Sequence, residues 1–412
     1  MRKRTVQDPE SQCAIPFDPT ARAQEIRRLL RAKVETSVIE AVQQLMLREL
    51  QSYCGDPFAH KEDGQMWRGG SAPGSIFVNG QWIKIRRPRV RSRKGEKELQ
   101  SYRAFRDRDV ISDEVARMML NGVSTRDYGR VFEPIAEGTR LGRAAVSEAF
   151  GYATQKHLSQ INGRSLAEYK WAALFFDGIQ FAGTTELVAL GITETGEKLV
   201  LGLREGASEN SEVCKDLIQS LVDRGLVFEG SILVVIDGSK ALKKAIEAVW
   251  GRRALIARCR VHKMRNVLEY LGKPYHDEAR RRINAAWSQN DYESAKSELL
   301  KTIRWLRSIN ESAANSLEEG IEETLTMHKL NLPEILRKSL ATTNVIESAL
   351  SIVRARTARV KNWRKGKGQV SRWTAAGLLI AEDRMNKIRG HKYLTLLVEK
   401  LRKKVETAEA VA

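Results

Sequence analysis

The spacing of apolar residues predicts a helical start to the chain. From residue 21 to 53, apolar side chains recur at helical intervals, beginning with Ile26, Leu29 and Leu30. This spacing is typical of an amphipathic helix. The stretch from Cys54 to Pro73 is rich in glycine and predicts a loop. We therefore expect residues 1–73 to form a helical N-terminal unit that ends in a loop.

The next pattern predicts a short β-hairpin that runs into positive charge. Residues 75–78 and 81–85 are mostly apolar, and Asn79-Gly80 between them tolerates the positive φ angles of a tight turn. From Lys84 to Lys97 there are eight basic residues and one acid, with Pro88 expected to interrupt any sheet or helix. The run is either a solvated charged surface or an arm that follows DNA phosphates. Its candidate DNA contacts are Lys84, Arg86, Arg87, Arg89, Arg91 and Arg93.

Residues 112–161 alternate between helical patterns and breaks. Ser112 and Ser124 are each placed to cap a helix, Gly122 separates the two, and a third helix is expected from about Leu141. The order is typical of a helix-turn-helix, although other small helical bundles share it. We expect residues 74–165 to combine the basic arm with this DNA-binding motif. Further candidate DNA contacts here are Arg126, Arg140 and Arg143.

From Trp171 onward the pattern changes to strands. Three apolar strands in a meander are followed by a helix, a strand, a helix and a strand, ending near residue 257. This is the order of a ribonuclease-H-like α/β core. We expect residues 166–262 to form its first part, residues 263–340 an all-helical insertion, and residues 341–412 its completion by a helix at 343–358 and basic C-terminal helices. The predicted fold is thus an α/β core with a large helical insertion, preceded by a mainly helical DNA-binding region with a short hairpin.

Charge indicates the kind of partner. The chain has 70 Lys and Arg against 51 Asp and Glu, a net charge of +19, which favours a polyanion such as nucleic acid. A membrane is the rival, but no apolar run approaches the roughly 18 residues of a spanning helix. The first residues also lack the apolar core of a signal peptide, so we expect a cytoplasmic protein. A Gly-Lys-Ser/Thr phosphate loop is absent, which argues against a nucleoside triphosphate as a partner.

Two aspartates follow apolar strands and precede glycine. Asp177 and Asp237 are therefore expected at strand carboxyl ends, where open α/β sheets bind ligands. If the strands are neighbours, the carboxylates converge and suit a pair of Mg²⁺ ions, or Mn²⁺. The alternative for each is an ordinary Asp-Gly turn. Glu347 is the best third ligand, although Asn344 and Glu347 also fit a capping box at a helix start.

An ordered set of motifs runs from about residue 115 to 400. The motifs are Asn121–Arg126, Phe176–Gly178, Gly191–Gly196, Arg224–Leu226, Val235–Gly238, Arg258–Asn266, Thr342–Glu347 and Arg372–Ala376. In this order they resemble the Mutator-type bacterial insertion-sequence transposases, which implies a protein associated with the bacterial nucleoid.

The resemblance implies an Asp, Asp, Glu triad formed by Asp177, Asp237 and Glu347, which holds two Mg²⁺ ions. It also implies cleavage at terminal inverted repeats and strand transfer into target DNA, by a homodimer or higher oligomer on double-stranded DNA. The family's Cys-x-x-His falls on Cys259 and His262, and further candidates for active-site support are Arg265, Asn266 and Asn344. A basic helix after the glutamate is expected to grip DNA with Arg354, Arg356, Arg359 and Lys361, followed by Arg372.

Three alternatives qualify this interpretation. A transposase that has lost its chemistry would be a DNA-binding regulator, and a related recombinase or nuclease would share the core. A structural zinc site at Cys259 and His262 is the third, but such a site normally takes four ligands in two pairs. The other cysteines, Cys13, Cys54 and Cys214, supply no second pair. We therefore expect Cys259 and His262 to support the catalytic centre.

Overall fold

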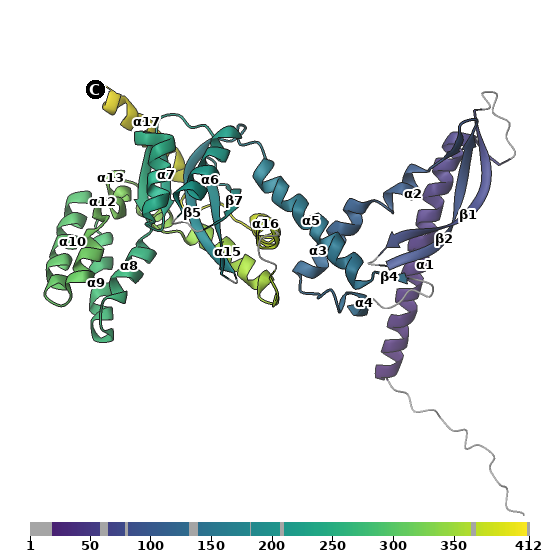
Figure 1. The fold of residues 1–412 in the computed structure, drawn as a ribbon, viewed down its shortest axis with the longest axis horizontal. Coiled ribbons are helices and arrows are strands. Elements are labelled where there is room, and N and C mark those ends of the chain that lie inside the picture. Colours follow the sequence, from purple (N-terminus) through teal and green to yellow (C-terminus); the bar gives the residue numbers. More distant parts are fainter. Residues whose placement is uncertain are drawn as a thin grey trace, which may run out of the picture. The chain divides into compact units, whose positions relative to one another are not determined.

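The chain divides into two compact units. The computed structural model describes residues 19–57, 65–78, 81–131, 139–181, 183–206, 210–363 and 368–409. One unit comprises Met1–Val115 and Ser124–Val146, and the other comprises Ala116–Val123 and Ser147–Ala412 (Figure 1). Within the described ranges, no helix combines the length and the apolar character needed to cross a membrane.

A long helix and a twisted sheet make up the core of the first unit. Val42, Met46 and Leu50 of the helix pack against Ile76 and Ile83 of the sheet. The strands follow the order β1-β2-β3, and β4 also pairs with β2. The elements are α1 (Pro19–Cys54), β1 (Met66–Val78), β2 (Gln81–Ser92), β3 (Gly95–Lys97), α2 (Gln100–Ala104) and β4 (Thr139–Arg140).

The predicted hairpin is confirmed, and it is longer than expected. Antiparallel pairing runs from Val78 and Gln81 to Met66 and Ser92, so the loop expected up to Pro73 is wrong for Met66–Pro73. The Asn79-Gly80 turn lies outside the described residues.

The sequence suggested that Pro88 would interrupt the second strand, but the strand continues through it. Pro88 lies inside β2 opposite Ser71, where the register shifts between Arg68 and Ser71. An irregular register removes the need for a regular ladder hydrogen bond, so a residue without an N–H is tolerated there.

Three helices follow, as expected from residues 112–161, with one different boundary. They are α3 (Arg108–Leu120), α4 (Tyr128–Val131) and α5 (Arg143–Gly163). Ser112 is not a cap, because α3 begins at Arg108 and Ser112 is buried within it. Ser124 does accept a hydrogen bond from the Asp127 N–H, at 3.1 Å, just before α4.

The second unit contains a five-stranded mixed sheet. Its order is β7-β6-β5-β8-β9, with antiparallel pairing among the first three strands and parallel pairing from β5 through β8 to β9. The predicted order of strands and helices is confirmed. The elements are β5 (Trp171–Phe181), β6 (Thr184–Thr193), β7 (Lys198–Glu205), α6 (Ser211–Asp223), β8 (Ile232–Ile236), α7 (Lys240–Trp250) and β9 (Ala254–Arg258).

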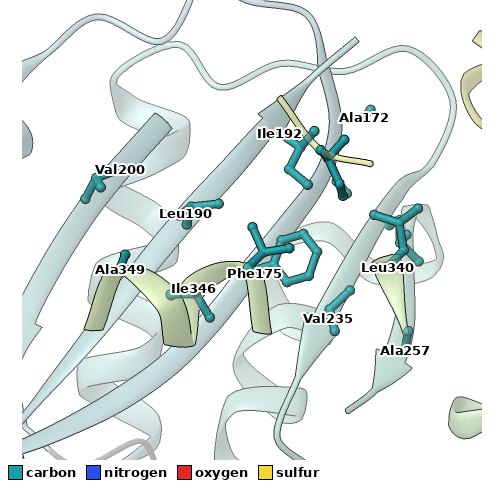
Figure 2. Packing of buried hydrophobic residues seen from close by; sticks show 14 of the residues in the cluster. Ala172, Phe175, Leu190, Ile192, Val200, Val235, Ala257, Leu340, Ile346 and Ala349 are labelled. Carbon is teal, nitrogen blue, oxygen red and sulfur yellow. The ribbon is translucent and has the colours of Figure 1, made fainter. Parts of the chain in front are cut away.

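Alternating side chains of the central strand feed two apolar cores, one on each face of the sheet. Phe176 packs with residues of α6 and α7. On the opposite face, Phe175 and Val235 pack with Ile346 and Ala349 (Figure 2). Helices that cover this second face include α15 (Asn344–Thr357), α16 (Gln369–Glu382) and α17 (Leu394–Glu409), together with residues of three further helices, Ile161, Met327, Leu336 and Leu340. The predicted C-terminal helical tail is therefore two helices, with a break between residues 383 and 393.

The segment between β9 and α15 is helical, as predicted, and has its own core, which includes Val267, Ile283 and Leu299. It starts and ends at one point, because the Arg260 N–H donates to the Ala341 carbonyl at 3.0 Å. Its helices are α8 (Arg260–Glu269), α9 (His276–Trp287), α10 (Tyr292–Arg307), α11 (Glu311–Glu318), α12 (Ile321–Thr324), α13 (Thr326–Lys329) and α14 (Glu334–Leu340). Short 3-10 turns of the unit are Gly251–Arg253, Lys273–Tyr275 and His391–Tyr393.

A buried carboxyl group on β6 makes the stability of this unit depend on pH. Glu186 is fully buried, and its Oε1 accepts a hydrogen bond from the Ser371 hydroxyl at 2.5 Å. Burial raises the pKa of Glu186 from 4.5 to about 7. The hydrogen bond from Ser371 opposes this rise, and the negative charge of Glu205 adds to it. The folded state therefore favours the protonated form.

We predict that Glu186→Gln flattens the dependence of stability on pH. The stabilisation from protonating Glu186 is complete below pH 4.5 and is lost as pH rises through about 7. In urea unfolding of the second unit, the drop in unfolding free energy between pH 5 and pH 8 should shrink by roughly 2 to 3 kcal/mol. The exposed Glu197→Gln is the matched control. An unchanged pH dependence in Glu186→Gln would contradict the assignment.

Candidate functional site

Parallel pairing of β5 and β8 brings the two aspartates level. Phe175 pairs with Val235, and two further residues along each strand give Asp177 and Asp237. Asp237 directly follows β8, as predicted, but Asp177 does not end its strand. β5 continues to Phe181 because this part pairs with β6. Only its pairing with β8 stops before Asp177, so the two carboxylates still lie at the end of the parallel ladder.

Burial and nearby charge destabilise the ionised form of Asp177. Its side chain is 8% exposed, and burial raises its pKa to about 6. His262 and the Gly178 N–H oppose this rise, whereas the charges of Asp237 and Glu347 add to it. The three acids and the imidazole therefore influence one another electrostatically. Asp237 is held by its own turn, in which Oδ1 accepts a hydrogen bond from the Ser239 N–H at 2.9 Å.

Glu347 comes to the site on the first turn of α15. The alternative of an Asn344–Glu347 capping box is wrong, because the N-cap is Thr343 and Asn344 is already the first helical residue. The Thr343 hydroxyl instead contacts the glutamate side chain directly, donating to Glu347 Oε1 at 2.8 Å. This contact restrains the half-buried carboxylate on the face of α15 that packs on the sheet.

Thr343 also joins the glutamate to the Cys-x-x-His pair. Its side chain is fully buried, with Oγ1 3.2 Å from Cys259 Sγ and 3.3 Å from His262 Nδ1. Its backbone N–H donates to the same sulfur at 3.3 Å. Thr343 has no predicted role from the sequence alone. The available signal was its place inside the Thr342–Glu347 motif, immediately before the helix that carries Glu347.

Cys259 and His262 lie beside the acids. The Cys259 N–H donates to the Ile236 carbonyl at 2.8 Å, one residue before Asp237. His262 Nε2 lies 3.7 Å from Glu347 Oε1. The hydrogen bond with Cys259 raises the pKa of His262, and Asp177 and Glu347 add to the rise. Burial raises the pKa of the Cys259 thiol, but hydrogen bonds from His262 and Thr343 outweigh it and leave that pKa lowered.

One group of three potential metal ligands is compact in the part of the chain that the structure describes. Cys259, His262 and Glu347 have ligand atoms within 4.8 Å of one another. The three acids do not form so tight a group. Two reasons explain the wider spacing of the acids. Carboxylates repel one another when no cation lies between them. Ligands that hold two ions roughly 4 Å apart are also spread more widely than the ligands of a single ion.

The remaining support candidates lie on the same two helices but do not bond the acids. Arg265 is exposed and Asn266 half-buried on α8, and Asn344 is exposed. No hydrogen bond or ion pair between described residues joins them to the three acids.

The basic arm of the first unit separates into free and paired cations. Lys84, Arg86, Arg91 and Arg93 are exposed. Arg87 and Arg89 instead form ion pairs with Glu96, at 2.8 and 2.5 Å. Arg126 and Arg143 are exposed, and Arg140 pairs with Gln81 through the β4–β2 ladder.

The basic residues after Glu347 also separate into two classes. α15 ends at Thr357, so the predicted single helix is wrong for Arg359 and Lys361. Arg356 donates to Asn121 Oδ1 at 3.1 Å, and Arg359 to the Asn121 carbonyl at 3.3 Å. Both guanidinium groups thus bind the C-terminal end of α3. Arg354 and Lys361 are exposed, and Arg372 is half-buried in α16.

Comparison with known proteins agrees with these motifs. The transposase for insertion sequence element ISRM5 of Rhizobium meliloti (strain 1021) is 29% identical over 294 residues, 68% of this chain and 70% of the relative. The transposase for IS1201 of Lactobacillus helveticus is 28% identical over 349 residues, 80% and 88% of the two chains. The transposase for IS256 in transposon Tn4001 of Staphylococcus aureus is 23% identical over 355 residues, 82% and 88%. A family model described as "Transposase, Mutator family" matches residues 17–371, and the protein therefore belongs to the Mutator family of transposases.

Proposed function

We propose that this transposase binds the terminal inverted repeats of an insertion sequence, cuts DNA strands there and joins them to target DNA. Asp177, Asp237 and Glu347 would carry the chemistry, on a sheet of ribonuclease-H-like type. The observation that supports this best is the register of β5 and β8, which aligns two aspartates under the helix of Glu347. The strand order β7-β6-β5-β8-β9 is consistent with such a core.

The three acids suit divalent cations. Their oxygens are the hard ligands that Mg²⁺ and Mn²⁺ prefer. The raised pKa of Asp177 reflects burial and the charges of Asp237 and Glu347, which His262 and the Gly178 N–H only partly offset. Two ions held by Asp177, Asp237 and Glu347 would polarise a phosphodiester and stabilise its leaving oxygen.

The chain's own residues would orient that centre. Thr343 holds one oxygen of Glu347, and His262 lies where its imidazole can bond a carboxylate or a DNA phosphate. Cys259 anchors Thr343 through its sulfur. Thr343 and Cys259 are positioning residues, which act through the glutamate, whereas His262 could either position the glutamate or contact DNA itself.

DNA binding would use surfaces in both units. The exposed cations of β2 and the arginines near α4 and α5 are the candidate contacts for terminal-repeat DNA, because phosphate contacts supply most of the affinity. A homodimer or higher oligomer would bring two ends together on target DNA. A DNA-binding regulator without chemistry would share these surfaces but not require the aligned acids.

We predict that Asp237→Asn abolishes strand cleavage and weakens Mn²⁺ binding but leaves DNA binding within about twofold, because affinity rests on cations elsewhere. Cleavage is measured by mapping nicked 3′ ends on terminal-repeat DNA, and Mn²⁺ binding by calorimetry. The control is Asp216→Asn, which removes an exposed carboxylate paired with Arg204 in the same unit. Full cleavage by Asp237→Asn would exclude the proposed triad.

We predict that Thr343→Val lowers the cleavage rate by roughly 10- to 100-fold, the usual effect of losing a residue that orients a metal ligand. Valine keeps the shape but removes the hydroxyl that contacts Glu347. Thr343→Ser keeps the hydroxyl and should retain most of the rate, with DNA affinity unchanged in both. If the valine and serine variants cut equally well, the hydroxyl has no role in orienting Glu347.

We predict that the two classes of cation after Glu347 differ in effect. Arg354→Gln with Lys361→Gln should reduce the slope of DNA affinity against salt by about one to two, since exposed cations can release counterions from phosphates. Arg356→Gln with Arg359→Gln should instead lower the melting temperature, because it removes hydrogen bonds to Leu120 and Asn121. The pairs are matched in number and charge. Identical effects on salt slope and melting would contradict this division.

A further inference from the structure

Two adjoining cavities form a groove between α8 and α9 that the proposed catalytic role does not use. The first has a volume of about 410 Å³ and the second of about 370 Å³. Val261, Met264 and Arg280 line both. We call this surface the α8–α9 groove. Each cavity falls within the range of sites that hold a small ligand or part of a larger one.

The groove opens beside the three acids. Arg260 and Val261, which line it, are the two residues between Cys259 and His262. On the opposite wall, Thr342 directly precedes Thr343, whose hydroxyl contacts Glu347. A strand of DNA bound at the acids could therefore continue into this groove, because residues adjacent in sequence to Cys259, His262 and Thr343 line it.

The groove wall carries a buried positive charge without an acidic partner. Arg260 is 8% exposed, and its guanidinium donates to the carbonyls of Thr324 and Trp287 and to His328. His328 Nε2 lies 3.1 Å from the Gln289 carbonyl and must donate to it, so Nδ1 is the neutral acceptor for Arg260. All these acceptors are uncharged.

A second buried guanidinium adds to this charge. Arg337 is 3% exposed and donates to the Asn290 carbonyl. Burial, together with repulsion by Arg337, lowers the pKa of Arg260 to about 9. No carboxylate lies within ion-pair distance of either group among the described residues. Buried charges without counter-charges are costly, and an anion in the groove would offset that cost.

The mouth of the groove supplies cations that an anion can reach. Arg280 is half exposed and pairs with the fully exposed Asp277, and Lys338 pairs with the exposed Glu334. Exposed pairs of this kind contribute little stability, so a phosphate can replace the carboxylate. Arg265 lines the second cavity, and Glu269 is the one acid among the lining residues of the two cavities.

We propose that the α8–α9 groove binds the sugar–phosphate backbone of the DNA strand that flanks the cleavage site, with Arg280 and Lys338 contacting phosphates. Val261 and Met264 face the sugars, and the charge of Arg260 and Arg337 attracts the backbone from below. The location beside the cleavage site rests on the proposed function, but the binding of DNA backbone does not.

The test compares Arg280→Gln with Lys338→Gln, made together in the full chain, and a matched control. The control is Arg281→Gln with Lys301→Gln, which removes two exposed, ion-paired cations from α9 and α10 that do not line the groove. Affinity for terminal-repeat duplex is measured without divalent metal at several salt concentrations. The groove variant should bind roughly tenfold more weakly with a salt slope smaller by about one to two, and the control should change less than about twofold.

Duplexes with single neutral methylphosphonates locate the contact. One near the cleavage site should weaken binding of the wild type but not weaken the groove variant further. The proposal would be overturned if the groove variant and the control had the same salt slope of DNA affinity. It would also be overturned if every methylphosphonate reduced the affinity of the wild type and of the groove variant equally. The wild type could fail to cut terminal-repeat DNA while the groove variant still shows a smaller salt slope of DNA affinity. That result would contradict the proposed function but support the groove as a site for the DNA backbone.

Discussion

Backbone pairing between β5 and β8 brings together two strands separated by more than 50 residues of sequence. The parallel ladder ends at Phe175 and Val235. Two residues further along each strand are Asp177 and Asp237, which therefore lie side by side. Apolar cores on both faces hold these strands, so the aspartates cannot move apart to relieve their repulsion. Burial raises the pKa of Asp177 to about 6, and the charge of the neighbouring Asp237 adds to the rise. A scaffold of apolar contacts thus maintains a charge arrangement that is unfavourable by itself.

Opposite uncompensated charges lie on the two sides of Thr342 and Thr343. On one side are the three acids, and on the other are the buried guanidinium groups of Arg260 and Arg337. Cations suit the first cluster and phosphate suits the second. A DNA strand crossing this boundary would present its phosphates to both. Under the proposed function, DNA and its divalent cations would offset both of these electrostatic costs.

Patterns along the chain predicted what depends on local sequence. Apolar runs identified the strands of the second unit, and the Asp-Gly pairs identified the acids. Contacts made only after folding escaped prediction. The Thr343 hydroxyl acquires its role from Cys259, more than 80 residues away, and Arg356 and Arg359 bind Asn121 rather than remaining free. The expectation that Pro88 ends the strand was wrong because the register shift opposite it makes room for proline. Such a shift arises from the pairing of two strands and cannot be seen in the sequence of either one.

The hydrogen bond between Arg260 and Ala341 has a consequence for how this family could diversify. It joins the first and last residues of the helical segment, so the chain leaves and re-enters the rest of the unit at one place. Within the segment, α8 to α11 pack in a core of their own, whereas Met327 of α13 and Leu336 of α14 belong to the core that covers the sheet. Helices α9 to α11 could therefore lengthen, shorten or be exchanged between lineages while the acids stay in place. Preference for one DNA substrate over another could then evolve on these outer helices without changing the sheet.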